Sequence, residues 1–130
     1  MSFETIWFIR AALIYLGVGV VLGLTMAIHP NWMLYIKPAH AHLNLLGFMA
    51  MFVYGIAYHV LPRFRGKLLY SPKLARMHLI LANVGLVGMA SAFGLRFTLG
   101  TAGTWALAAF GTLEVVAVGM FIVNAWKTLE

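Results

Sequence analysis

The sequence predicts an all-α integral membrane protein with four transmembrane helices, and three observations support this fold class. Hydrophobic residues make up 63% of the chain, whereas soluble domains contain about 45–50%. Charged residues account for only 9%, too few to cover a water-soluble surface. Four apolar runs are long enough to cross a bilayer, and none alternates with the period of two that a membrane β-strand requires. The runs lie at about 6–28, 39–61, 77–95 and 104–126, within a single domain over residues 1–130.

Proline and glycine mark the ends of these helices. The markers, in chain order, are His29-Pro30-Asn31, Lys37-Pro38, Pro62-Arg63, Ser71-Pro72 and a turn from Gly100 to Gly103. Because proline is tolerated at a helix start and blocks extension beyond an end, we expect Pro38 to open the second helix and Pro62 to follow it. Arg10 precedes the first apolar stretch, as in a signal peptide. That stretch exceeds the usual length of a signal peptide's apolar region, so we expect it to remain as a helix.

Basic residues divide unequally between the two sides of this topology. Seven of the nine lie on the side shared by both termini and the connection between helices two and three, and only Lys37 and Arg96 lie on the other. The positive-inside rule then places both termini in the cytoplasm. Tryptophans fall near both expected interfaces, with Trp7 and Trp126 on the inner side and Trp32 and Trp105 on the outer side.

Composition also excludes several classes of function. The chain has no cysteine, which excludes disulfides, iron–sulfur clusters, thiolate zinc sites and cysteine nucleophiles. Any metal chemistry therefore falls to the five histidines. The net charge of +6 does not indicate nucleic acid, because the basic residues flank apolar runs instead of forming a patch interleaved with aromatics.

Two histidines lie at the start of the second predicted helix. His40 and His42 are expected just inside the outer membrane interface, where polar groups usually face a partner or a cofactor. Positions i and i+2 of a helix point about 200° apart, so the two imidazoles cannot easily chelate one ion. We expect them to serve two different sites, although imidazoles near a helix start can also simply lie among lipid headgroups.

The remaining histidines have a structural and a functional interpretation each. His59 ends the second helix and His78 starts the third on the same side, so a second metal or haem site there is geometrically allowed, beside interfacial or hydrogen-bonding roles. His42 and His59 are separated by about 25 Å of helix, at about 1.5 Å per residue, and cannot share one ion. His29 precedes Pro30, and we expect it to satisfy free carbonyls at the end of the first helix.

Glu114 lies in the middle of the fourth predicted helix, where an unpaired carboxylate would cost several kcal/mol. One interpretation is a structural contact, for instance with Asn83 of the third helix. The other is a proton relay or a cofactor-facing role.

The segment from Ile36 to Phe48, Ile-Lys-Pro-Ala-His-Ala-His-Leu-Asn-Leu-Leu-Gly-Phe, continues into the aromatic stretch from Tyr54 to Phe64. It is similar to helix 2 of subunit I in the haem-copper oxidase superfamily, above all in its cbb-type oxidase and nitric oxide reductase branches. The resemblance covers about residues 36–90. It implies that His40 is an axial ligand to low-spin haem, and a shifted alignment would favour His42.

The resemblance also implies an architecture. The large subunit of that family has twelve helices in three arcs of four, and this chain looks like a single arc. Three copies would then rebuild the ring as a homotrimer. The family carries a His-x-His on the counterpart helix of another arc, whose two imidazoles bind two different haems. The cytoplasmic membrane of a bacterium or archaeon is the expected location.

The sequence departs from the family at the copper site. It has neither the adjacent His-His pair nor the His-Pro-Glu-Val-Tyr run of the oxidases. Oxygen reduction is therefore not expected, and we lean against an enzyme. The leading hypothesis is a membrane haem b protein acting in electron transfer or in binding nitric oxide or oxygen. The alternatives are a haem-free copper or other metal site, and a cofactor-free accessory or assembly subunit of a respiratory complex.

Overall fold

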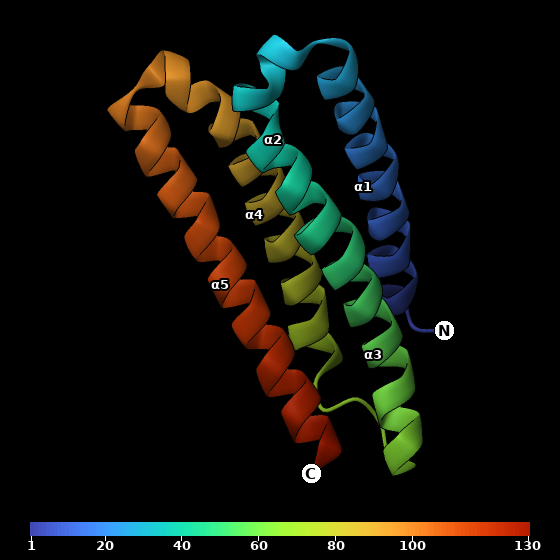
Figure 1. The fold of residues 1–130 in the computed structure, drawn as a ribbon. Coiled ribbons are helices and arrows are strands. Elements are labelled where there is room, and N and C mark those ends of the chain that lie inside the picture. The colour runs from blue at the N-terminus through green and yellow to red at the C-terminus, as the bar shows by residue number, and fades with distance from the viewer.

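The computed structural model describes all 130 residues, which form four long helical rods and no strand (Figure 1). The first, third and fourth rods are single helices, and the second is composite. In chain order the elements are α1 (Phe3–Ile28), a 3-10 turn (Pro30–Trp32), α2 (Met33–His42), a π-helical stretch (Leu43–Ala50), α3 (Met51–Arg65), α4 (Pro72–Leu99) and α5 (Thr101–Leu129). All four rods are long and apolar enough to cross a membrane, which indicates a multi-pass membrane protein.

α1 and α4 begin before their apolar runs because serine side chains cap their first turns. Ser2 precedes α1, and its side chain accepts a hydrogen bond from the main-chain N–H of Thr5. Ser71 precedes α4, and its side chain accepts one from the main-chain N–H of Leu74. α3 ends in a Schellman arrangement around Gly66, whose φ of 60° favours glycine. The apolar runs thus miss the first turn of every rod, and the last turn of every rod except α1.

The composite rod starts earlier than the sequence predicts. The expected opening at Lys37-Pro38 is wrong, because the helix begins at Met33 and Pro38 lies inside it. Pro62 likewise lies inside α3, which continues to Arg65. Membrane helices tolerate internal proline, since neighbouring groups satisfy the freed carbonyl. The π-helical stretch directly follows the two histidines, and nothing in the sequence predicts it.

The connection between α4 and α5 is tighter than expected. A turn from Gly100 to Gly103 was the prediction, but Gly100 alone reverses the chain, with a φ of 54°, and α5 starts at Thr101. Gly103 instead allows close packing, because a Cβ there would lie 2.5 Å from the Cα of Arg96. Further along, a Cβ at Gly88 would overlap the Phe110 ring. Small residues therefore bring α4 and α5 together, as is usual in lipid.

The bundle has two distinct ends. Both chain termini and the loop of residues 66–71 lie at one end, called the termini end here, and the 3-10 turn and Gly100 lie at the other, called the turn end (Figure 1). The composite rod packs between α1 and α4, and α5 packs mainly against α4. His40 and His42 thus belong to the turn end, and His59 and His78 to the termini end.

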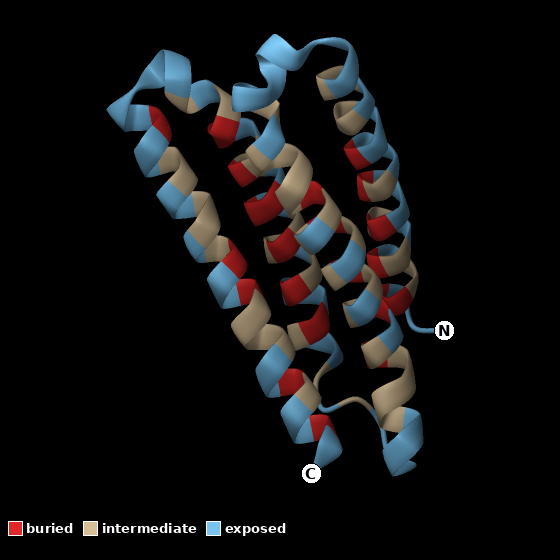
Figure 2. Cartoon of the chain, in the orientation of Figure 1, coloured by how far each residue is buried: buried red, intermediate tan, exposed pale blue.

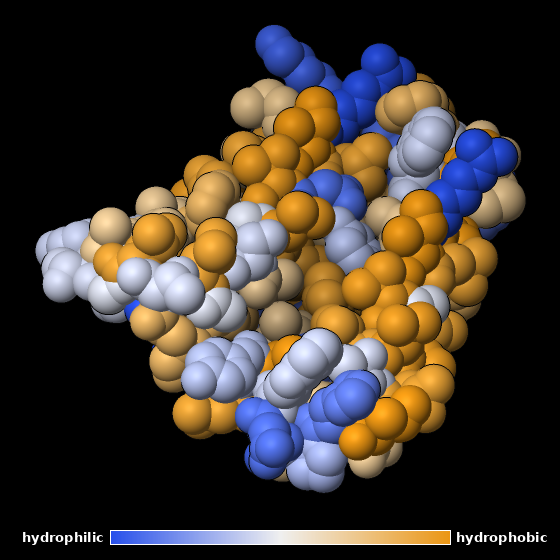
Figure 3. Space-filling model, turned by 90° about the horizontal axis from the view of Figure 1, so that it is seen from above, coloured by the Kyte–Doolittle hydropathy of each residue, from blue (hydrophilic) through white to orange (hydrophobic).

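Buried residues form a stripe on the inward face of each rod, and the outward faces are exposed (Figure 2). Large apolar side chains such as Leu13, Val20 and Val115 are more than half exposed. Seen from above, apolar residues cover much of the bundle's outline (Figure 3). Such a surface is expected where lipid surrounds the helices.

Candidate functional site

His40 lies in a notch of α1 that two glycines create. A Cβ at Gly23 would be 3.1 Å from the imidazole Cε1, and Gly19 leaves similar space for the neighbouring Asn44 amide. The His40 Nδ1 lies 2.9 Å from the Gly19 carbonyl oxygen. Because a carbonyl oxygen only accepts, Nδ1 carries the hydrogen and donates it. The Asn44 amide nitrogen also lies 3.3 Å from this Nδ1, but two donors cannot bond each other. The amide donates to the main-chain oxygen of His40 instead, at 2.8 Å.

His42 has the same arrangement on the other flank of the helix. Its Nδ1 lies 2.8 Å from the carbonyl oxygen of Pro38, one turn earlier, and donates to it. The ring packs against Phe93 of α4, with ring centroids 4.8 Å apart. His40 therefore contacts α1, whereas His42 contacts α4.

Both histidines consequently present the same chemical group. With Nδ1 protonated, each neutral imidazole holds its lone pair on Nε2, and neither Nε2 makes a hydrogen bond within the chain. Metal-binding histidines almost always donate their other ring N–H to an acceptor in this way, which fixes the tautomer and the ring orientation. The donor set at the turn end therefore suits a metal that accepts single imidazole ligands.

Space for a large cofactor is not found beside these two rings within one copy. None of the four main cavities is lined by His40 or His42. No group of three or more His, Cys, Asp or Glu side chains gathers as it would to hold a bare metal ion. A porphyrin bound at either Nε2 atom would need a wall from a second molecule.

His29 caps α1 through its backbone. Its main-chain N–H bonds the Thr25 carbonyl oxygen, at 2.8 Å, and its ring stacks on Trp32 with centroids 5.0 Å apart. The expected helix-terminal position is found, although the backbone and not the imidazole satisfies the carbonyl.

At His59 the Nδ1 atom accepts a hydrogen bond, whereas in His40 and His42 it donates one. Arg63, one turn later, donates from Nη1 to His59 Nδ1 at 2.8 Å and to the His59 carbonyl oxygen at 2.6 Å. Since a guanidinium only donates, His59 Nδ1 must hold the lone pair, and Nε2 carries the hydrogen. This Nε2 is therefore not a free ligand while the bond to Arg63 persists.

His78 is fully buried in an aromatic cage. Its ring lies against side chains from three other helices, with centroid separations of 4.7 to 5.8 Å, and these are Phe8, Tyr54, Tyr58 and Phe121. The Tyr58 hydroxyl bonds its Nδ1 at 2.9 Å, and its Nε2 is buried without a partner. No hydrogen bond or ring contact joins His78 to His59, and a second metal or haem site at the termini end stays a prediction.

Glu114 does not contact Asn83, and that expectation is wrong. Asn83 accepts a 2.7 Å hydrogen bond from the Tyr15 hydroxyl of α1, while the Glu114 carboxyl packs over Gly85 and its Oε1 is buried without a partner. Residues 83 and 85 are two positions apart on α4, so they face different neighbours. The structural contact is with the glycine, and the proton-relay interpretation stays a prediction.

Two further polar contacts between helices, besides Tyr58–His78, were not predicted from the sequence. The first is the Tyr15–Asn83 pair, and the second is an ion pair of 2.6 Å between the buried Glu4 of α1 and Arg76 of α4. Glu4 is one of only three acidic residues in the chain, which is the signal that could have singled it out. Seven basic residues lie on the same side of the predicted topology as Glu4. Only the packing of α1 on α4 shows which of them is its partner.

Comparisons with known proteins give no further guide to the site. No family model matches the sequence, no characterised protein matches it, and no solved structure matches the fold. The resemblance to haem-copper oxidases therefore rests on the pattern in residues 36–90 alone.

Proposed function

We propose that the protein binds haem b through the Nε2 atoms of His40 and His42 and transfers electrons within the membrane. One observation carries this proposal: both imidazoles donate from Nδ1 to a main-chain carbonyl, which leaves both Nε2 lone pairs unengaged. A neutral imidazole anchored at its other nitrogen is the form that binds metals.

The proposed haem lies between copies of the chain. His40 and His42 diverge onto α1 and α4, and no main cavity reaches either ring, so one copy supplies one ligand to each of two haems. A closed ring of identical subunits satisfies this arrangement, and the resemblance favours a homotrimer with up to three haems. His40 of one copy and His42 of its neighbour would clasp the same iron.

Electron transfer follows from the ligand set. When bound by two imidazoles, haem iron has no open position, and it supplies one-electron transfer. The chain's residues would hold the imidazoles in place: the Gly19 and Pro38 carbonyls orient the rings, and Phe93 restricts His42. The surrounding apolar helices would exclude water from the site. Binding of nitric oxide or oxygen would require one imidazole to leave.

The proposed location is the cytoplasmic membrane of a bacterium or archaeon, with both termini in the cytoplasm. The excess of basic residues at the termini end supports this orientation. Reporter fusions to the C-terminus should be active only as cytoplasmic reporters. Activity restricted to a periplasmic reporter would contradict the orientation.

The first test is an absorption spectrum with metal analysis of protein purified from haem-supplemented cells. We expect a Soret band, low-spin α and β bands in the reduced form, and no change on adding carbon monoxide. A spectrum that changes with carbon monoxide would favour gas binding. Stoichiometric copper without haem would favour the haem-free metal site, and absence of both would favour an accessory subunit.

The second test is the molecular mass in mild detergent. Multi-angle light scattering should give three chains per particle when haem is bound. A monomer that retains its haem would contradict binding between copies.

A further inference from the structure

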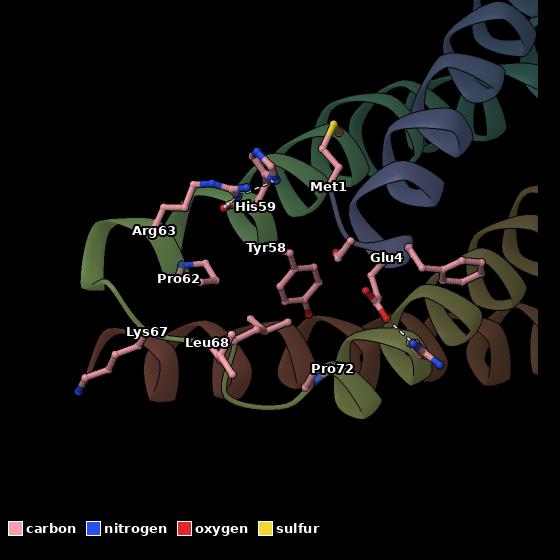
Figure 4. A pocket seen from close by; sticks show the side chains of 13 residues that line it. Met1, Glu4, Tyr58, His59, Pro62, Arg63, Lys67, Leu68 and Pro72 are labelled. Carbon is pink, nitrogen blue, oxygen red and sulfur yellow. Dashed lines mark hydrogen bonds and ion pairs between the residues drawn. The ribbon is translucent and has the colours of Figure 1, made fainter.

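A cavity of about 630 Å³ opens at the termini end, far from His40 and His42. It lies among the start of α1, the end of α3 and the start of α4. In Figure 4 the Tyr58 ring projects into its middle, while His59 and Arg63 lie together on the α3 side. A volume of this size is typical of ligand sites.

The charge around this cavity is positive and mostly uncompensated. Its lining includes three cations, Arg63, Lys67 and Arg76, and one carboxylate, Glu4. Glu4 is neutralised by Arg76, at 2.6 Å. The chain's only other ion pair joins Lys127 to Glu130, so neither Arg63 nor Lys67 has a carboxylate side chain as partner.

The two uncompensated cations have donors to offer. Arg63 uses one Nη1 group on two neutral acceptors of His59, which leaves the rest of its guanidinium fork free. Lys67 makes one long contact, 3.5 Å, to the main-chain oxygen of Glu130. Both side chains line the same cavity, and a planar guanidinium and an ammonium are the groups that proteins use to bind phosphate.

Part of the remaining wall is apolar. Pro62, Leu68 and Leu69 line the cavity, and the Leu68 side chain is 92% exposed. Basic and apolar residues are interleaved along residues 63–69, which is typical of segments that enter an anionic lipid interface. An inorganic anion would make no favourable contact with these apolar side chains, whereas a lipid would.

We infer that this cavity binds the phosphate headgroup of an anionic phospholipid, with Arg63 and Lys67 contacting the phosphate and Leu68 and Leu69 contacting the acyl region. Basic pockets between transmembrane helices bind such headgroups in general. The site is independent of the proposed haem, because it shares no residue with it.

Native mass spectrometry of the detergent-purified protein tests this inference. Phosphatidylglycerol, phosphatidylcholine and inorganic phosphate are titrated separately, and phosphate is also added as a competitor. We expect phosphatidylglycerol to bind most tightly and inorganic phosphate not to displace it. Displacement by inorganic phosphate, or equal affinity for phosphatidylcholine, would overturn the assignment.

A matched pair of double variants identifies the cations. Arg63→Gln/Lys67→Gln should weaken phosphatidylglycerol binding about 30-fold, as expected for two cations near a lipid surface. Arg65→Gln/Lys73→Gln removes the same charge from the same end but not from the cavity lining, and should weaken binding less than about threefold. Equal weakening by both pairs would show only diffuse surface attraction and would overturn the site.

Two controls separate loss of binding from loss of the fold. The first is thermal unfolding in detergent, which should be unchanged in both double variants because all four substituted side chains are exposed. The second is a milder variant. Arg63→Lys keeps the charge and loses the planar fork, so it should weaken binding by only a few-fold. Weakening equal to that of the double variant, or none at all, would contradict the role given to Arg63.

Discussion

At the turn end, His40 and His42 donate from Nδ1 to main-chain carbonyls, whereas at the termini end His59 accepts at the same atom from a guanidinium. His78 meets a tyrosine hydroxyl at that position. A carbonyl forces the lone pair onto Nε2, and a guanidinium forces it onto Nδ1. The partner of one nitrogen therefore decides whether the other can bind a metal.

Burial separates the two ends further. His42 is half-buried against one aromatic ring, while His78 is fully buried and has aromatic neighbours on α1, α3 and α5. A ligand cannot approach the His78 Nε2 without opening the cage. The turn end thus offers accessible ligands, and the termini end uses its deepest histidine for packing.

The largest effect on stability is expected from removing the His78 ring from its aromatic cage. His78→Ala should lower the free energy of unfolding by about 3 kcal/mol, because it leaves a cavity among packed rings. His78→Phe should restore most of this loss and cost about 1 kcal/mol for the Tyr58 hydroxyl left without a partner. Unfolding in detergent followed by circular dichroism measures both variants.

These two variants also test the comparison. Haem content per folded chain should be unchanged in His78→Phe. A loss of haem in that variant, with the fold intact, would make His78 a ligand and erase the difference between the ends.

A smaller effect is expected from disturbing the notch around His40. In Gly23→Val the new side chain would press on the imidazole, since a Cβ alone would lie 3.1 Å from Cε1. Haem affinity should fall about tenfold, as is usual when the support of a ligand is altered. Haem titration measures this fall, with Gly17→Val as the control, because a Cβ at Gly17 meets no atom within 4 Å. Equal affinities in the two variants would argue against His40 as a ligand.

The smallest effect is expected at His59. His59→Gln removes a ring whose only side-chain partner is exposed, so the free energy of unfolding should stay close to the wild-type value. Haem content should stay at the wild-type value. A clear drop in haem would instead support the second metal or haem site that the sequence allows at the termini end.

The number and class of the elements follow from the sequence, because four long apolar runs in a chain with few charges predict four membrane-spanning helices. The helix ends do not follow, since they depend on caps such as Ser2 and Ser71 that lie outside the runs. Pro38 was a misleading signal: in lipid, an internal proline is tolerated. The π-helical stretch after His42 has no local signature.

The candidate site is predictable only in part. Helix geometry alone gives the divergence of positions 40 and 42. The acceptor of the His40 hydrogen is Gly19, on another helix, and only packing selects it. Packing between helices also explains why the pairing of Glu114 with Asn83 is wrong. The partner of Asn83 is Tyr15 of α1.

The most direct test of the central claim is the haem content and reduced absorption spectrum of four single variants purified side by side. His40→Ala and His42→Ala should each lose the low-spin spectrum and most of the haem, because each would remove one of the two imidazole ligands that we propose. His59→Ala and His78→Phe should keep both. Full haem content with an unchanged low-spin spectrum in either turn-end variant would contradict the account.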